Sequence, residues 1–459
     1  LIYDPDADRF ILTFLKNNNP ASNKIFICFS SSNDPLDPWY VYSLPGNPLN
    51  NDRWTDYPAV SITDKEFFVT GNLLIPGVSW QVGFDGSVIW QVNKGDGYTN
   101  ANDITSTLYS QIKHEGFYTR NIHPVRGATG IAEKQYFLSN RNFDLTNDTV
   151  FVMHLTGNQD DPNTELIVDY AVTDVPYGFP PNGQQEDTDL SDPTSGLQTN
   201  DARVLGAFLL NDKIQYVANT VNPTTGRAAI YHGFIKNPSS DLPEINGTII
   251  ASDSLDYGYP NIAFTGKSKN ESQAIIGFDF ASIKDYPGVG AIYYNNDNAY
   301  SDLQVLVNGE SYIDRLSGTW ERWGDYFGIQ TKFNSPGIIY TSGYYSLAFN
   351  NNSTWVSEIF SPDTNFVETN PVAGTNVYPN PTGIYEDINV QFNVSGAQNI
   401  SAYIYDLNGR LIQKIIESPA EAGVYVLTFS TAPLSSGTYV IRVLDKDDNE
   451  ILSEKFVKN

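Results

Sequence analysis

Short apolar runs alternate with polar turns along almost the whole chain. Typical apolar runs lie at residues 25–31, 66–72 and 203–210, and segments rich in Gly, Pro, Asn and Asp separate such runs. Runs of this length between turn residues are typical of β-strands. No long segment with a helical period of 3.6 residues is apparent between residue 1 and about residue 370. The pattern therefore predicts an all-β protein.

Three segments that precede strand-like runs have a common composition. Residues 54–58, 256–260 and 322–326 each combine aromatic residues with Asp and with Gly or Pro. Repeated short meanders in a chain of this length favour radial stacking into a β-propeller, which leaves few exposed sheet edges. We count about six or more blades of roughly 40–60 residues each, and we expect the first to be incomplete. Two or three β-sandwiches in series remain an alternative.

The last part of the chain is predicted to be a separate small domain. It opens with an Asn-Pro step and continues with strand-like runs at residues 388–394, 400–405 and 423–429. Between these runs, Asn408 and Gly409 form a pair that suits a tight hairpin. We expect a propeller over residues 1–370, a linker over 371–376 and a C-terminal β-sandwich over 377–459.

Charge and composition exclude several classes of partner. The formal net charge of −26 argues against nucleic acid, because phosphate binding needs clustered Lys and Arg. The single cysteine, Cys28, excludes an internal disulfide framework. No run of eighteen apolar residues is present, so no transmembrane segment is expected. The chain begins without Met or a signal peptide, and we expect a segment upstream of Leu1 to be missing.

Candidate metal and catalytic chemistry is sparse. Asp4, Asp6 and Asp8 alternate as in a Ca²⁺ loop, but Arg9 and Leu15 occupy the positions of the required Gly and Glu. A hairpin turn is the favoured interpretation, with structural Ca²⁺ as the weaker alternative. The histidines form no HExxH or His-x-His pair, so no metal ligand set is expected; they are His114, His123, His154 and His232. We assign no catalytic residue and expect no cofactor.

The three aromatic segments supply the candidate residues of the propeller. These candidate corner residues are Asp56, Tyr57, Arg322, Trp323 and Asp325. Arg322, Trp323 and Asp325 could line a central funnel, but a buried Arg–Asp pair that braces a blade corner explains them better. Large aromatic side chains are more often packed in a core than used to bind a ligand.

Motifs in the C-terminal part resemble a known family. They occur at residues 378–381, at 405–410, and at 434–443 followed by 455–458. Together, and in this order, they resemble the type A C-terminal sorting domain of type IX secretion substrates. The residues that carry the resemblance are Tyr378, Pro379, Asn380, Pro381, Asp406, Gly409, Arg410, Gly437, Tyr439, Lys455, Val457 and Lys458. A generic immunoglobulin-like tail used in adhesion is the alternative.

This resemblance implies that the domain is a targeting signal for export and not an enzyme. It implies passage through the periplasm and the outer membrane to the cell surface or the extracellular space. The implied partners are a PorV-type outer-membrane β-barrel shuttle and the type IX translocon. The resemblance leaves open whether the domain is cleaved after export.

The first 370 residues resemble a second family, the extracellular bacterial β-propeller proteins. This resemblance rests on residues 3–9, 32–40, 56–58 and 322–326. It implies a fold and a surface location, but no activity.

We therefore expect an exported surface or secreted protein of the binding or adhesion type. Its propeller is expected to bind a surface polysaccharide or a protein. A secreted hydrolase of polysaccharide or peptide is the first alternative, and it predicts carboxylates with perturbed pKa values in a deep pocket. The second alternative is an accessory component of the type IX secretion or gliding motility machinery.

Overall fold

The computed structural model forms two compact units, Leu1–Thr364 and Asn365–Asn459. It describes the chain apart from residues 190–194, 241–242, 317–319, 334, 363–376, 379–381, 383–386, 395, 397, 407–409, 421–422, 447–449 and 459. The regular secondary structure of the described residues is β-strand, as predicted, apart from one five-residue helix, α1 (Lys94–Tyr98). No helix among them is long and apolar enough to cross a membrane.

The first unit begins with two four-stranded antiparallel sheets. Sheet 1 has the order β1 (Ile2–Asp4), β2 (Arg9–Lys16), β3 (Lys24–Ser30) and β4 (Trp39–Pro45). Sheet 2 has the order β5 (Trp54–Ile62), β6 (Glu66–Leu74), β7 (Phe84–Asn93) and β8 (Ser106–Tyr109). Each strand pairs with the strand before it in the chain, which is the meander that the alternating sequence pattern predicts.

The next two sheets are joined at their edges. Sheet 3 has the order β11 (His123–Pro124), β13 (Tyr136–Asn140), β14 (Asn147–Leu155) and β15 (Leu166–Tyr177). Sheet 4 contains β17 (Val204–Leu210), β18 (Lys213–Val221), β19 (Ala228–Lys236) and β20 (Glu244–Ile250). A single parallel pair, Thr173 with Ile245, connects them, and β12 (Arg126–Gly127) runs parallel to β17.

Two further sheets complete the first unit. Sheet 5 has the order β21 (Asp256–Phe264), β22 (Ala274–Ser282), β23 (Asp285–Tyr294) and β24 (Gln304–Val307). Sheet 6 has three strands, β26 (Gly328–Thr331), β27 (Ile338–Leu347) and β28 (Asn351–Phe360). Short two-stranded pairs link the loops, namely β9 (Lys113–His114) with β10 (Phe117–Tyr118) and β16 (Leu197–Gln198) with β25 (Glu321–Arg322).

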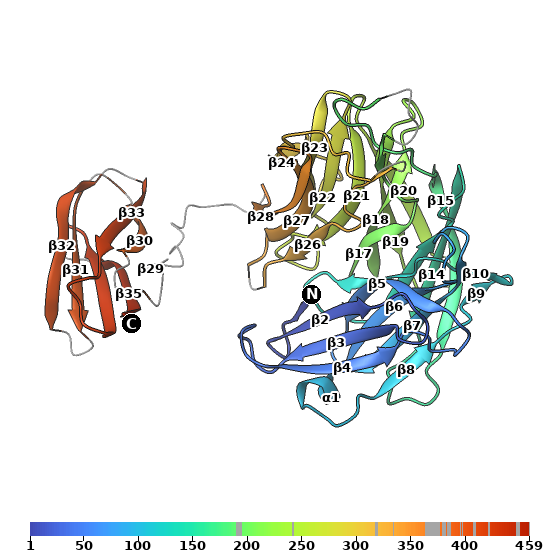
Figure 1. Cartoon of the computed structure of the whole chain (residues 1–459), viewed down its shortest axis with the longest axis horizontal. Coiled ribbons are helices and arrows are strands. Elements are labelled where there is room, and N and C mark those ends of the chain that lie inside the picture. The colour runs from blue at the N-terminus through green and yellow to red at the C-terminus, as the bar shows by residue number, and fades with distance from the viewer. Residues whose placement is uncertain are drawn as a thin grey trace. The chain divides into compact units, whose positions relative to one another are not determined.

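The six sheets follow one another in chain order, and the first unit is a β-propeller (Figure 1). Five hydrophobic clusters lie between successive sheets, so each sheet buries its apolar side chains against the next one. The first strands of the sheets contact one another in turn around the middle, as β5 contacts β11, β11 contacts β17, β17 contacts β21, and β21 contacts β26.

The seam between sheet 6 and sheet 1 differs from the other five interfaces. Among the described residues, no hydrophobic cluster includes side chains from both sheets. One aromatic contact spans the seam, between Tyr3 and Phe333 with ring centroids 5.3 Å apart. On sheet 1, Leu12, Phe14 and Val41 stay 36%, 44% and 57% exposed. The propeller is therefore less tightly closed here than elsewhere.

One detail of the predicted fold, the position of the incomplete blade, is wrong. We expected the first blade to be incomplete, but sheet 1 has four strands, because the short β1 already pairs with β2 from Ile2 to Asp4. The sheet with three strands is sheet 6. The shorter sheet is thus the last in the chain rather than the first.

The second unit consists of two antiparallel sheets around their own core. One sheet has the order β29 (Val377–Tyr378), β30 (Asp387–Val394) and β33 (Gly423–Ser430). The other has the order β32 (Leu411–Ala420), β31 (Gln398–Asp406), β34 (Gly437–Leu444) and β35 (Glu450–Lys458). Ile388, Phe392, Ile404, Ile441 and Phe456 pack between the sheets, which gives the β-domain that the strand pattern predicts.

Candidate functional site

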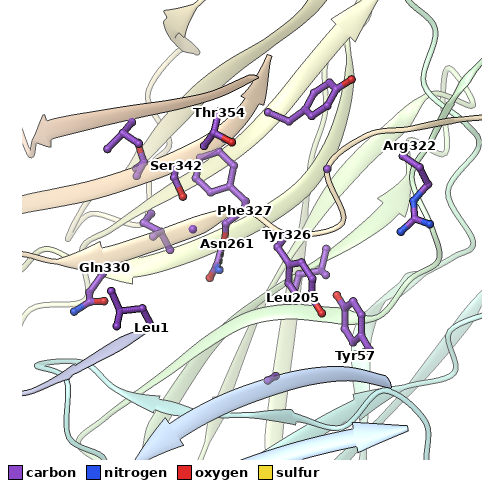
Figure 2. A pocket seen from close by; sticks show the side chains of 18 of the residues that line it. Leu1, Tyr57, Leu205, Asn261, Arg322, Tyr326, Phe327, Gln330, Ser342 and Thr354 are labelled. Atoms are coloured by element: carbon purple, nitrogen blue, oxygen red, sulfur yellow. Dashed lines mark hydrogen bonds between the residues drawn. The ribbon is translucent and has the colours of Figure 1, made fainter. Parts of the chain in front are cut away.

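The middle of the propeller contains a cavity of about 1050 Å³. Strands of several sheets contribute to its wall, among them β5, β12, β17, β21, β26 and β27. Figure 2 shows side chains from these strands around the cavity, with Tyr57, Leu205, Asn261, Arg322, Tyr326 and Gln330 labelled. Because strands from several sheets meet around it, we treat this central cavity as the candidate site.

Two tyrosines form one side of the central cavity. The rings of Tyr57 and Tyr326 stack with centroids 5.0 Å apart and an interplanar angle of 14°, and they lie next to each other in Figure 2. The guanidinium of Arg203 lies 4.2 Å from the Tyr57 ring centroid. Asp201 holds this guanidinium with two hydrogen bonds, of 2.7 Å from Nε and 2.9 Å from an Nη atom. Asp201 and the Tyr57 ring therefore occupy the Arg203 guanidinium. The Tyr326 ring, by contrast, is accessible from the cavity, because this side chain is 53% exposed.

The corner residues share an unusual backbone. Tyr57 and Tyr259 both adopt a positive φ, of 56° and 52°, in front of a proline. In both strands the pairing register shifts at this point, between Asp56 and Ala59 and between Gly258 and Asn261. A bulge re-aims the side chains beside it, and here it occurs in the first strands of sheets 2 and 5. In the third segment, Asp325 has a φ of 82°.

Arg322 and Asp325 form an ion pair, but it is not buried. The Arg322 side chain remains 59% exposed while that of Asp325 is 21% exposed, and the second nitrogen–oxygen distance is 3.2 Å. The expectation of a buried bracing pair is therefore wrong for Arg322, since that side chain reaches the open cavity. An exposed pair of this kind contributes little to stability.

Trp323 does not belong to the cavity wall. It is fully buried and packs against two glycines, because a Cβ atom at Gly183 or Gly258 would lie 2.5 Å or 2.9 Å from its ring. Asp56 is partly buried, and burial raises its pKa against the opposing effects of the Tyr57 amide and of Arg203. Of the five predicted corner residues, Tyr57 and Arg322 line the cavity.

Sequence reasoning missed two arginines in the central cavity. Arg126 follows β11 and belongs to β12, and Arg315 lies in the loop before β25. The nearest acceptors of the Arg126 guanidinium are the carbonyl oxygens of Val60 and Ile329, at 3.4 and 3.5 Å. Arg315 donates to the side-chain oxygen of Asn352 at 2.9 Å. Within the described part of the chain, neither guanidinium has a carboxylate within ion-pair distance.

Carboxylates are scarce at the central cavity. Of the described residues that line it, Glu321 is the one with a carboxylate, and one of its oxygens accepts hydrogen bonds from the backbone amides of Arg315 and Leu316. Asp279 lies beneath the wall, where its Oδ1 accepts from the Tyr344 amide at 3.0 Å. Burial raises the pKa of Asp279 well above its usual range, because it disfavours the charged carboxylate.

His123 lines the central cavity, but Asp4 and His232 are engaged elsewhere. The Asp4 carboxylate binds the Lys94 ammonium at 2.7 Å and accepts from the Tyr98 hydroxyl at 2.7 Å. His232 is buried between the Tyr300 hydroxyl at 2.9 Å and the Gln215 side-chain oxygen at 3.1 Å. No group of three potential metal ligands occurs among the residues that the structure describes.

Two motif residues of the second unit, Asp406 and Arg410, contact each other. Asp406 Oδ1 accepts from the Arg410 amide at 2.9 Å, and the side chains of the two residues pair at 3.3 Å. The prediction of a hairpin at Asn408 and Gly409 falls outside the described residues, as do Pro379, Asn380 and Pro381.

Except for Tyr378, the remaining motif residues lie on the last two strands. Gly437 pairs with Lys458, and Tyr439 pairs with Phe456, whose rings stack at 5.6 Å. Lys458 is almost fully buried, and its ammonium donates to the Thr431 hydroxyl at 2.9 Å. Val457 is 37% exposed, and Lys455 is exposed on the same strand. Tyr378 belongs to β29, which pairs with β30.

Comparison with known proteins identifies the C-terminal part. Residues 376–459 match the family described as the secretion system C-terminal sorting domain. No protein with a curated description matches the chain.

Solved structures resemble the chain only remotely. Trypanosoma rangeli sialidase in complex with the inhibitor DANA is 9% identical, over 96% of this chain and 84% of that one, with a TM-score of 0.37. A glycoside hydrolase family 32 protein from Bifidobacterium adolescentis is 10% identical, over 99% and 74%, with a TM-score of 0.33. Penicillium chrysogenum α-L-arabinanase complexed with arabinobiose is 11% identical, over 67% and 93%, also with a TM-score of 0.33. These similarities carry no argument about activity.

Proposed function

We propose that this protein is a type IX secretion substrate whose propeller binds a ligand outside the cell without chemically changing it. Residues 376–459 are a secretion system C-terminal sorting domain, and they indicate export by type IX secretion to the cell surface or the extracellular space. The sorting domain interacts with the secretion machinery, and a PorV-type β-barrel shuttle is the partner that we propose for it.

The central cavity supports binding rather than hydrolysis. Glycoside hydrolysis commonly needs two carboxylic side chains that flank the scissile bond. Among the described wall residues, Glu321 is the one carboxylate, and it is occupied by backbone amides. The scarcity of carboxylates at a wall with three arginines is the observation that carries the proposal.

Binding and turnover can be separated in one experiment. The full chain is incubated with oligosaccharides from cell-surface and extracellular polysaccharides, and both retention on the protein and newly formed reducing ends are measured. We expect saccharides to be retained with no new reducing ends above the level of a heat-denatured sample. Release of shorter products would contradict the proposal.

One observation favours the hydrolase alternative. Asp279 is a carboxyl group whose pKa is raised by burial. It lies beneath the cavity wall, next to Gly324, Gly343 and Tyr344, which all line the cavity. A carboxyl group with a raised pKa is what a general acid requires. If products are released, the Asp279→Asn variant tests this role, because the amide keeps the shape of the side chain but cannot donate a proton as a carboxylic acid does.

A further inference from the structure

The central cavity has a charge opposite to that of the molecule around it. The chain carries a net charge of −26, yet the described wall residues include three guanidinium groups and the single carboxylate of Glu321. Asp325 pairs with Arg322, which leaves Arg126 and Arg315 without an ion-pair partner among the described residues. Acidic proteins repel anions in general, so a local excess of arginine marks the place where an anion is attracted.

Arg126 is the strongest indication within this wall. Its guanidinium has five N–H donors, and the two protein acceptors that it reaches are carbonyl oxygens at the limit of hydrogen bonding, 3.4 and 3.5 Å away. Burial lowers its pKa, which is the sign of a cation that lacks a compensating charge. A partly buried guanidinium without an anionic partner is costly unless a ligand or water supplies acceptors.

The wall of the cavity also offers flat apolar surfaces. Tyr326 is 53% exposed and Tyr340 is 43% exposed, and both line the cavity. The stack with Tyr57 fixes the Tyr326 ring in place. Tyrosine rings present an apolar face with a polar edge, which suits the faces and hydroxyl groups of sugar rings.

Resting on the proposed binding function, we infer that the central cavity recognises an acidic saccharide, whose carboxylate binds Arg126 and whose sugar ring packs on Tyr326. Arg315 and Arg322 at the wall supply further donors to the same chain of acidic sugars. Arginine suits this role because its planar fork matches a carboxylate with two parallel hydrogen bonds.

The test uses a pair of probes that differ only in charge. Trigalacturonate and its fully methyl-esterified form have the same sugar rings, but the ester lacks the carboxylates. Binding of each probe to the full chain is measured by titration calorimetry at low ionic strength. We expect the acid to bind about tenfold or more tightly than the ester, since charged hydrogen bonds are stronger than neutral ones. We also expect added salt to weaken binding of the acid.

Matched variants locate the site. Arg126→Met keeps the apolar stem and removes the guanidinium, and it is expected to weaken binding of the acid about tenfold or more. Arg53→Met removes a guanidinium that pairs with Asp85 outside the cavity, and it is expected to leave binding unchanged. Arg315→Met at the exposed rim serves as a second cavity variant if Arg126→Met does not fold, which a thermal melt decides.

Several outcomes would overturn the inference. Equal affinity for the acid and the ester would exclude recognition of the carboxylate. Equal affinity of sulfate and trigalacturonate would reduce the site to one for simple anions. Tight binding of the ester alone would show that the ligand is not acidic, but it would agree with the proposed binding function. Cleavage of trigalacturonate would contradict the proposed binding function itself.

Discussion

Trp323 is the fully buried residue of the third aromatic segment, residues 322–326. It is the largest fully buried side chain of the described residues, and Gly183 and Gly258 leave the space that its ring fills. We expect Trp323→Ala to destabilise the propeller by about 3–5 kcal/mol, through lost burial and an unfilled cavity. Urea unfolding monitored by intrinsic fluorescence measures this loss.

A second tryptophan provides the control for this prediction. Trp355 lies on β28 and remains 37% exposed, so Trp355→Ala is expected to cost less than about 1 kcal/mol. Equal losses in the two variants would show that Trp323 does not have the packing role assigned to it.

His232 gives the stability of the propeller a defined pH dependence. Burial lowers its pKa to about 3 from the usual 6.5, so it stays neutral in the folded protein while the unfolded chain binds a proton below pH 6.5. Its contribution to stability is therefore present above pH 6.5 and is lost as the pH falls toward 3. Each such group contributes a slope of up to about 1.4 kcal/mol per pH unit in this window.

The His232→Gln variant tests this assignment. Glutamine does not titrate, so the free energy of unfolding is expected to fall less steeply between pH 6.5 and pH 4 than in the original chain. Chemical denaturation at several pH values supplies both slopes. Parallel slopes would mean that His232 is not the group responsible.

At the residue scale, sequence reasoning found some members of the site and missed others. Tyr57 and Arg322 stand in recurring aromatic segments, which made them visible as candidates. Arg126 carries no such signal, because its two acceptors are 66 and 203 residues away along the chain. Only the folded propeller brings a lone arginine, a carbonyl of β5 and a carbonyl of β26 together.

The hairpins are the elements whose backbone conformation depends most on the local sequence. The turn between β17 and β18 contains Asn211 and Asp212 alone, with φ values of 51° and 54°, and Leu210 pairs with Lys213. Two-residue hairpin turns with both φ angles positive favour Asn, Asp and Gly, because β-branched side chains are strained there.

We therefore expect opposite behaviour from two substitutions at Asp212. Asp212→Val is expected to destabilise the propeller by about 1–2 kcal/mol, since a branched side chain fits poorly at a positive φ. Asp212→Gly is expected to stay within about 0.5 kcal/mol of the original chain, because glycine adopts this φ freely. Thermal unfolding compares the two, and equal shifts would contradict the turn geometry.

Strand patterns predicted the sheets well but not every detail of their assembly. The alternation of apolar and polar residues gave the meanders and the blade count, because each blade is built from neighbouring strands. The two-residue strands β11 and β12 were not predictable, since they are too short to show a period. The three-stranded sheet 6 depends on which strands pair at the seam, and no local pattern encodes that choice.

At the scale of the whole molecule, the two units have different tasks. The propeller has five hydrophobic clusters of its own, and the C-terminal unit has one. The motifs in the C-terminal unit were recognisable in the sequence because they recur in a family. The ligand that we propose for the propeller was not recognisable in the sequence, because the proposal depends on the charge of a cavity that many distant residues form.

The central claim is that the C-terminal unit exports the protein and that the propeller is its cargo. The most direct measurement is exposure at the cell surface, in a bacterium with type IX secretion, of the full chain and of a chain that ends at residue 364. Both are expressed behind the same signal peptide, and a third protein joins residues 365–459 to a periplasmic reporter. The account predicts that the full chain and the reporter fusion reach the surface or the medium, while the shortened chain stays in the periplasm. Surface exposure of the shortened chain, or retention of the fusion, would contradict it.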